Sequence, residues 1–402
     1  MNFALLLAAS PAKSQPLRQD EVGSPLTSHA VSPRFTHLKL EDGLSQGTIL
    51  ALHEDKNGFM WIGTQDGLNR YDGYEIKVFE SEPFDDETVS SSWINDIDED
   101  ADGALWLATR RGLSRMDPVT EKFSSFRNDP DNDTSIPDDA LRDVLVDSDG
   151  RIWTASRKGV ARMDAERKGV FERFEYDPAD STSLCHPDAF SLFEDSSGLI
   201  WVGTENGLGI TDRKNPGAFE CVLNIAHPPI YFYNTPEGEV DGMLERPQEP
   251  GVLWVGTSAG LVRLDVASRR TELFVPHPDY TGTNRRFNQV LRLAQDPTNP
   301  GVLWVPTYGG GLTRFDIRTK QFITYSADPE NPDGMLQDAA TLTFADRSGM
   351  VWVGTETQGL SRFNPASVIF AHYRSSPNNR NSLPGRTVYG IFQSKDGVVW
   401  VG

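Results

Sequence analysis

Short apolar stretches separated by Gly, Asp and Asn run along most of the chain. In residues 48–81, four such stretches follow one another: TILALHE, FMWIGT, GLNRYD and EIKVFES. They are rich in β-forming residues and show no helical stripe. An Asp and a Gly three residues apart separate the first two stretches, as in a type I turn. The pattern predicts four short antiparallel strands joined by tight turns.

This four-strand pattern is repeated. The stretch NGFMWIGTQDGLNRYDG at 57–73 returns six more times, and an eighth copy, DGVVWVG, occupies 396–402. A period of about 45–53 residues indicates a repeat architecture. Because eight near-copies of this unit exist, no single copy is a candidate for a catalytic site. Each copy centres on a Trp of structural role: Trp61, Trp106, Trp153, Trp201, Trp254, Trp304, Trp352 and Trp400.

A four-stranded sheet on its own has two apolar faces and two open edges, so it must pack against its copies. Radial closure gives a β-propeller in which each Trp fills the space between neighbouring blades. FTHLK at 35–39 resembles FAHYR at 370–374, and seven Trp units lie between them. The sequence therefore predicts an all-β fold: a seven-bladed β-propeller closed by Phe35–Leu40 as the outer strand of blade seven, plus the first, truncated blade of a second propeller.

The predicted division of the chain follows. Residues 1–33 are a clipped signal peptide and a disordered leader, because MNFALLLAAS is apolar and the next segment is rich in Ser, Pro and Gln. Residues 34–367 form the propeller, and 368–402 begin the second one. Pro306 replaces the small residue found two positions after most of the Trp residues, which predicts a locally irregular strand.

Repeated polar residues are interpreted as structural. The Asp that precedes each Gly by three residues forms a turn. The Arg of the third strand is followed by Asp or Asn two residues later, which predicts an ion pair between strands. The turn residues are Asp55, Asp100, Asp147, Asp195 and Asp346, and the arginines are Arg70, Arg115, Arg162, Arg263, Arg314 and Arg362.

Composition narrows the function. A formal net charge of −20 argues against duplex nucleic acid and anionic membranes as partners. No apolar run reaches the roughly 18 residues that cross a bilayer. Cys185 and Cys221 have no metal-ligand spacing; a disulfide between them is possible in the periplasm, and buried or idle thiols are the default interpretation. DPDNDTS at 129–135 lacks the Gly of a calcium loop. No metal, cofactor or catalytic residue is predicted.

Candidate ligand-binding residues lie in the variable turns between second and third strands, which share one face with the connections between blades. Blades two and three carry Arg110, Arg111, Arg157 and Lys158 there, on an acidic protein. These four balance acidic loops or bind an anionic ligand such as an acidic or sulfated sugar, since Arg binds carboxylate and sulfate in bidentate fashion. Trp93 and Tyr308 are candidates for stacking on a sugar ring.

GLSQGTILALHEDKNGFMWIGTQDGLNRYDGYEIKVF resembles the two-component regulator propeller repeat, and so do its copies across residues 35–402. The resemblance implies the periplasmic input region of a membrane sensor with two propellers, a β-sandwich, a membrane helix and a cytoplasmic histidine kinase or diguanylate cyclase. These downstream domains would be its partners, together with a small-molecule or oligosaccharide ligand; a homodimer of the parent is left open. The chain departs from this pattern because it ends in repeat eight.

Three function classes follow. The preferred one is a non-enzymatic propeller that senses a carbohydrate or other small nutrient. The second is an enzyme on the same scaffold, of streptogramin-lyase-like or glycan-cleaving type. The third is a protein-docking platform.

Overall fold

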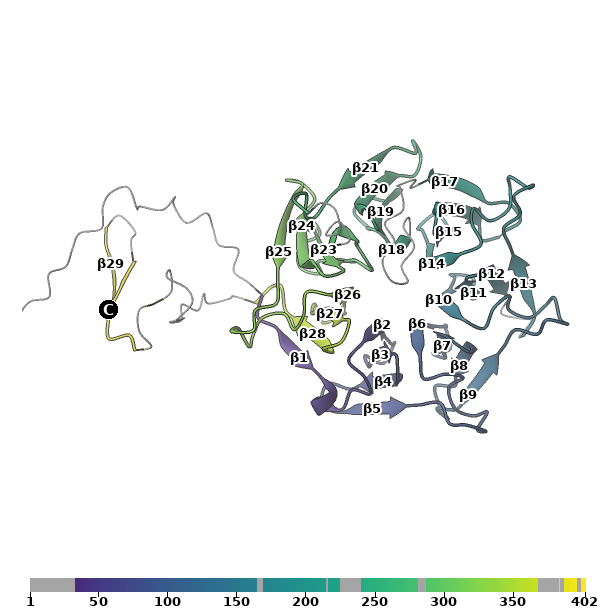
Figure 1. The fold of residues 1–402 in the computed structure, drawn as a ribbon, viewed down its shortest axis with the longest axis horizontal. Helices are drawn as coiled ribbons and strands as arrows, with labels where there is room; N and C mark the ends of the chain where they lie inside the picture. Colours follow the sequence, from purple (N-terminus) through teal and green to yellow (C-terminus); the bar gives the residue numbers. More distant parts are fainter. Residues whose placement is uncertain are drawn as a thin grey trace, which may run out of the picture. The chain divides into compact units, whose positions relative to one another are not determined.

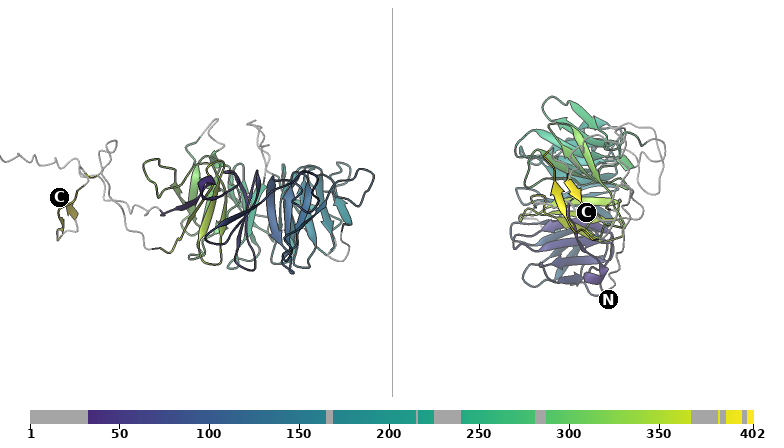
Figure 2. Two further views of the ribbon diagram at one scale, coloured as in Figure 1. Left: turned by 90° about the horizontal axis from the view of Figure 1, so that it is seen from below. Right: turned by 90° about the vertical axis from the view of Figure 1, so that its left-hand side faces the viewer.

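The computed structural model describes residues 33–164, 169–214, 216–224, 240–280, 287–367, 383, 387–395 and 399–402. Pro33–Ile369 form one compact unit. It is a ring of seven four-stranded antiparallel sheets, seen along its axis in Figure 1 and edge-on in Figure 2. The predicted seven-bladed β-propeller is confirmed. Among the described residues, no helix has the length and apolar character needed to cross a membrane.

The blades follow one another in chain order around the ring, each with its first strand at the centre (Figure 1). Blades one to three are β2 (Ile49–Glu54), β3 (Met60–Thr64), β4 (Gly67–Tyr71) and β5 (Ile76–Phe79); β6 (Ile94–Glu99), β7 (Leu105–Thr109), β8 (Gly112–Met116) and β9 (Phe123–Phe126); and β10 (Leu141–Val146), β11 (Ile152–Ser156), β12 (Gly159–Met163) and β13 (Phe171–Phe174). Blades four to six are β14 (Ala189–Glu194), β15 (Leu199–Thr204), β16 (Gly207–Asp212) and β17 (Glu220–Asn224); β18 (Val240–Glu245), β19 (Val252–Thr257), β20 (Gly260–Asp265) and β21 (Thr271–Phe274); and β22 (Ala294–Gln295), β23 (Val302–Thr307), β24 (Gly311–Asp316) and β25 (Gln321–Tyr325).

Blade seven is completed from the other end of the described chain. Its inner strands are β26 (Ala340–Ala345), β27 (Val351–Thr355) and β28 (Leu360–Phe363), and β1 (Thr36–Leu38) pairs antiparallel with β28 as the outermost strand. Phe35 is 3% exposed and makes an edge contact with Phe363 at 4.9 Å. The closing strand is therefore present, but it ends at Leu38 because a 3-10 helix, η2 (Leu40–Asp42), begins at Leu40.

The repeated Trp residues form the seven interfaces between blades. Trp61 of blade one packs against Ile94 and Leu105 of blade two, and Trp352 of blade seven packs against Ile49 of blade one. All seven ring tryptophans are at most 3% exposed. A buried aromatic side chain removes on the order of 150–250 Å² from water, so this one position contributes much of the apolar burial that holds neighbouring blades together.

The repeated Asp residues do form turns, as predicted, and they also bind the Trp. In blade one, Oδ1 of Asp55 accepts the backbone N–H of Asn57 and Phe59 at 2.9 and 3.0 Å. Its Oδ2 accepts the indole Nε1–H of Trp61 at 2.8 Å. The same bond fixes the Trp in blades two, three, four, six and seven, at 2.6–3.0 Å.

The predicted pairing of each repeated Arg with the Asp or Asn two residues later is wrong for most blades. Only Arg162 lies within ion-pair distance of that partner, with Asp164 at 3.7 Å, among the described ion pairs. The other Asp residues accept backbone N–H groups of their own hairpin turns, as Asp117 does from Val119 and Thr120. These bonds lower the pKa of Asp117. Four of the arginines, Arg162 among them, lie over the Trp of their own blade, at 5.0–5.8 Å.

Pro306 distorts the sheet of blade six, although in a different strand from the one predicted. β23 pairs regularly with β24 through Pro306 and Leu312. The inner strand β22 is shortened to two residues, Ala294–Gln295. Proline has no N–H to donate to the inner strand, so the ladder between the two strands is interrupted at Pro306, while Ala294 still pairs with Trp304 and Gln295 with Leu303.

Near the C-terminus, β29 (Ile391–Gln393) and β30 (Val399–Val401) form an antiparallel pair in which Phe392 lies opposite Trp400. They belong to a unit separate from the ring. Trp400 is 63% exposed, in contrast to the ring tryptophans. The second propeller stays a prediction, and residues 1–32 of the predicted leader lie outside the described residues.

Candidate ligand-binding site at the channel mouth

The inner strands of all seven blades surround a central cavity of about 260 Å³. In six blades the register of the inner strand shifts near its start, as between Ile94 and Asp96 in blade two. Such a bulge leaves one residue unpaired and turns its side chain away from the ladder. The side chains at this position reach the next blade: Asn95 donates to the carbonyl of Leu141 at 2.6 Å, and Thr341 donates to that of Ile49 at 2.7 Å.

Inside the channel, three charged residues from three blades meet. Arg292 of blade six forms ion pairs with Asp96 of blade two and Asp143 of blade three, the second at 3.2 Å. Each carboxylate also binds the next blade, because Asp96 accepts the N–H of Val144 at 3.2 Å and Asp143 accepts that of Leu192 at 2.7 Å. Two carboxylates and one guanidinium thus tie blades two, three, four and six together across the channel.

Burial makes these carboxyl groups unequal. Burial, and then the charge of Asp96, raises the pKa of Asp143 well above its usual value. Burial also opposes ionisation of Asp96, but the charge of Arg292 and hydrogen bonds outweigh it and hold the pKa of Asp96 below its usual value. The pair therefore favours one shared proton and one negative charge, which Arg292 balances. Asp98 lies two residues after Asp96 in β6, and burial raises its pKa to about 6.

The predicted basic residues lie where expected, on two neighbouring hairpins. Arg110 and Arg111 form the turn between β7 and β8, Arg157 and Lys158 form the turn between β11 and β12, and all four are exposed. The guanidinium of Arg110 lies over the ring of Trp93 at 3.3 Å from its centroid. Partial burial, and then the positive charge of Arg157, lowers the pKa of Arg110. The structure therefore brings Trp93, Arg110 and Arg157 together.

Tyr308 lies apart from this group. It follows β23 in blade six, and its hydroxyl donates to Glu356 of blade seven. One face of Trp93 is covered by Arg110, and its Nε1 donates to Asn95 at 2.8 Å. Of the two aromatic residues predicted to stack on a sugar, only Trp93 adjoins the basic turns.

Sequence reasoning missed a second group beside the first. Arg142, the bulge residue of blade three, lies over the ring of Phe190 of blade four at 3.6 Å and pairs with Asp188 at 3.4 Å. His186 lies 3.8 Å from a carboxylate oxygen of Glu205, and its ring is tilted by 34° against that of Tyr176, with centroids 6.3 Å apart. One signal could have found the first two residues. They occupy the second position of successive inner strands, directly after an apolar first residue.

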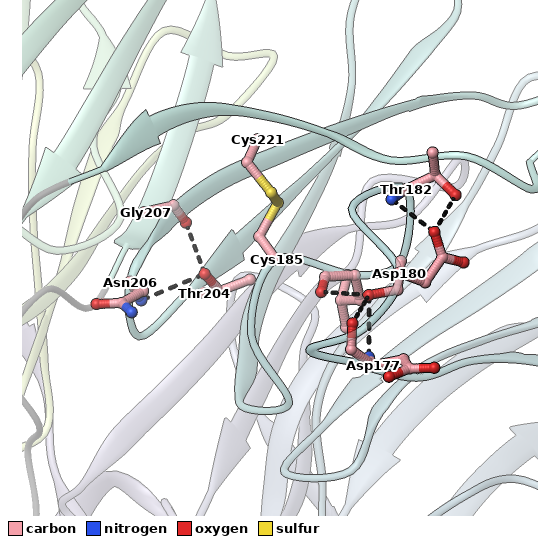
Figure 3. The surroundings of a disulfide bond; sticks show 10 residues. Asp177, Asp180, Thr182, Cys185, Thr204, Asn206, Gly207 and Cys221 are labelled. Atoms are coloured by element: carbon pink, nitrogen blue, oxygen red, sulfur yellow. Dashed lines mark hydrogen bonds between the residues drawn. A yellow bond between two sulfur atoms is a disulfide. The ribbon is translucent and has the colours of Figure 1, made fainter.

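Cys185 and Cys221 form a disulfide, with Cα atoms 5.7 Å apart (Figure 3). The default interpretation of unpaired thiols is therefore wrong, and its alternative, the disulfide, is present. Cys185 occupies the place of Ser45 and Ser90 in blades one and two, where the Ser hydroxyl bonds a Thr of the second strand at 2.9 Å. In blade four, Gly209 makes room: a Cβ there would lie 3.0 Å from Cys185 Sγ. The bond fixes the loop before β14 to the outer strand β17.

The loop that the disulfide fixes carries two residues of this second group, His186 and Asp188. It runs from Asp177 to Asp188 and is braced by Asp180, which accepts the N–H and hydroxyl of Thr182 at 2.9 and 2.7 Å (Figure 3). His186 and Asp188 lie one and three residues after Cys185. The disulfide therefore limits how far His186 can move from Glu205 and how far Asp188 can move from Arg142.

Comparison with known proteins identifies the repeat. Residues 43–66 and 183–206 match the family model of the two-component regulator propeller. Two segments of this chain, in blades one and four, therefore match the two-component regulator propeller repeat. A segment of 49 residues, 12% of this chain and 4% of the relative, is 43% identical to histidine kinase P4 of Formosa agariphila. The family resemblance seen in the sequence is thereby confirmed.

Solved structures with the same fold include the extracellular domain of the putative hybrid two-component system BT3049 from B. thetaiotaomicron. It has a TM-score of 0.74 and 22% identity, over 92% of this chain and 47% of that domain. A catalytically inactive virginiamycin B lyase from Staphylococcus aureus, solved with quinupristin, has a TM-score of 0.58 and 14% identity, over 82% of this chain and 98% of that one. The chain thus spans about half of the length of the extracellular domain that it resembles.

Proposed function

We propose that this propeller is the ligand-sensing input region of an extracytoplasmic bacterial sensor, periplasmic in its parent. It acts without catalysis and recognises a carbohydrate or other small nutrient. The family repeats and the likeness to the extracellular domain of a hybrid two-component system support this role. The parent's output would come from a kinase or cyclase domain beyond this chain.

The observation that carries the proposal is the mouth between blades two, three and four. Exposed Arg111, Arg157 and Lys158 adjoin two guanidinium–aromatic stacks, Arg110 on Trp93 and Arg142 on Phe190. Guanidinium groups bind carboxylate and sulfate in bidentate fashion, and aromatic rings bind the apolar face of a sugar. This combination suits an acidic or sulfated oligosaccharide.

The channel carboxyl groups support a sensor over an enzyme on this scaffold. Asp96 and Asp143 are 6% and 5% exposed, share Arg292 and each accept a backbone N–H from the next blade. Glycoside cleavage uses two carboxyl groups placed on either side of the scissile bond. These two instead hold the ring together.

The test is binding of a panel of acidic and neutral oligosaccharides by calorimetry, at low and high salt. Removing Arg110 and Arg111 together (Arg110→Ala/Arg111→Ala) should weaken acidic ligands about tenfold or more, because charge-assisted bonds contribute about 1.5–3 kcal/mol each. The matched control is Lys56→Ala/Arg318→Ala, which removes two exposed charges from turns at the opposite face. Equal affinity in both variants, or a preference for neutral glycans, would contradict the site.

A further inference from the structure

Blade five lacks the Asp–Trp hydrogen bond that is present in the other six blades of the ring. Residues 246–254 read RPQEPGVLW and residues 296–304 of blade six read DPTNPGVLW. In blade six, Asp296 accepts the indole N–H of Trp304 at 3.0 Å and the backbone N–H of Thr298 at 2.8 Å. Arg246 stands at the same spacing in blade five. A hydrogen-bond donor thus replaces the acceptor.

Two buried donors are left over as a result. Trp254 is 1% exposed, and its Nε1–H has no partner among the residues that the structure describes. The side chain of Arg246 is 9% exposed, and its Nε–H also lacks a described partner. A buried donor without an acceptor costs about 1–3 kcal/mol, so native structures rarely keep two such groups in one turn.

The neighbouring acceptors are already engaged. Glu249 lies 3.5 Å from Arg246 and also pairs with Arg263, so one carboxylate faces two guanidinium groups. Glu245 accepts the backbone N–H of Gly251 and of Ser196, each at 2.6 Å. The cluster of Arg246, Glu249, Arg263 and Trp254 therefore carries one excess positive charge and lacks the acceptor that the other blades supply.

We propose that this cluster binds a small monovalent anion of chloride size, in the place that the Asp carboxylate occupies in the other six blades. The anion accepts the indole N–H of Trp254 and the Nε–H of Arg246 and balances the second guanidinium. The site lies at the turn between β18 and β19 and is separate from the ligand mouth, which lies on the turns between second and third strands. The anion anchors blade five.

The experiment has a structural and a thermodynamic arm. Crystals grown in bromide should show an anomalous peak within hydrogen-bonding distance of Trp254 Nε1. In solution, replacing gluconate with chloride at constant ionic strength should raise the melting temperature of the wild type by about 1–3 °C. The reason is that a ligand that binds only the folded state stabilises that state.

The restoring variant is Arg246→Asp, which returns the acceptor found in blade six. It should abolish the chloride dependence and the bromide peak and melt at or above the temperature of the wild type in chloride. Arg318→Asp, at an exposed turn, changes the net charge equally and should keep the full chloride response. A water alone at the site, or the same chloride response in Arg246→Asp, would overturn the proposal.

Discussion

Blade seven and blade four each have a stabilising feature that the other blades lack. The two features join residues at very different separations along the sequence. In blade seven, β1 and Phe35 join residues more than 300 positions away, with Leu38 opposite Leu360. In blade four, the disulfide joins residues 36 positions apart within one blade. The comparison shows that closure of the ring depends on a short non-covalent strand, while the covalent bond serves one loop at the ligand mouth.

The largest effect is expected from removing the closing strand. Deletion of residues 34–41 exposes the edge of β28 and the ring of Phe363, and loss of the buried Phe35 alone costs about 3–5 kcal/mol. We expect aggregation or a strongly lowered melting temperature, measured by soluble yield and calorimetry. Deletion of 369–402 is the control and should do little. If that second deletion is the more damaging, closure does not depend on β1.

A smaller and local effect is expected from removing the disulfide. Cys185→Ser/Cys221→Ser should lower the free energy of unfolding by about 2–4 kcal/mol, as for other bonds closing a loop of this length. Ser is the natural replacement, because blades one and two have Ser at this position. Hydrogen exchange should rise in residues 177–188 and in β17, and stay unchanged in β1. An equal rise in β1 would show that the disulfide also supports closure.

The same contrast explains what the sequence could reveal. The period, the Trp at each centre and the likeness of FTHLK to FAHYR predicted the blade count and the closing strand, because each repeat restates the same packing problem. A feature that occurs in one blade has no such repetition. The disulfide was missed for this reason: only alignment of Cys185 with Ser45, and the small Gly209 beneath it, shows that the two sulfur atoms can meet.

The candidate site was predicted in part for a related reason. Hairpin turns are visible as variable letters between repeated flanks, so the positions of Arg110 and Arg157 could be derived. Arg142 and Phe190 lie in strands, and a bulge exposes them to the mouth. A bulge is a backbone event that sequence alternation does not record. The channel residue Arg292 meets Asp96 and Asp143 only because the ring closes, so no local pattern predicts that cluster.

The smallest effect is expected from a change of pH. It should again distinguish the closing strand β1 from the disulfide of blade four. His37 lies in β1, and its Nδ1 is 3.1 Å from the hydroxyl of Ser361 in β28. Burial is the largest influence on its pKa and Lys39 adds to it, while a hydrogen bond with the Pro332 carbonyl and the charges of Asp333 and Asp42 oppose it; the result is a pKa below the usual 6.5. The docked strand therefore binds a proton less readily than the detached strand does.

The sign follows from this difference. The detached state takes up more protons as the pH falls through about 6.5, so docking weakens on acidification and the loss levels off below the lowered pKa of docked His37. Proteolysis at β1 should be faster at pH 5.5 than at pH 7.5, and His37→Gln should reduce that ratio towards one. His277→Gln is the matched control, since burial also lowers the pKa of His277 but this residue lies in the loop after β21, away from β1. If both variants flatten the response at β1 equally, the pH dependence belongs to the whole ring rather than to its closing strand.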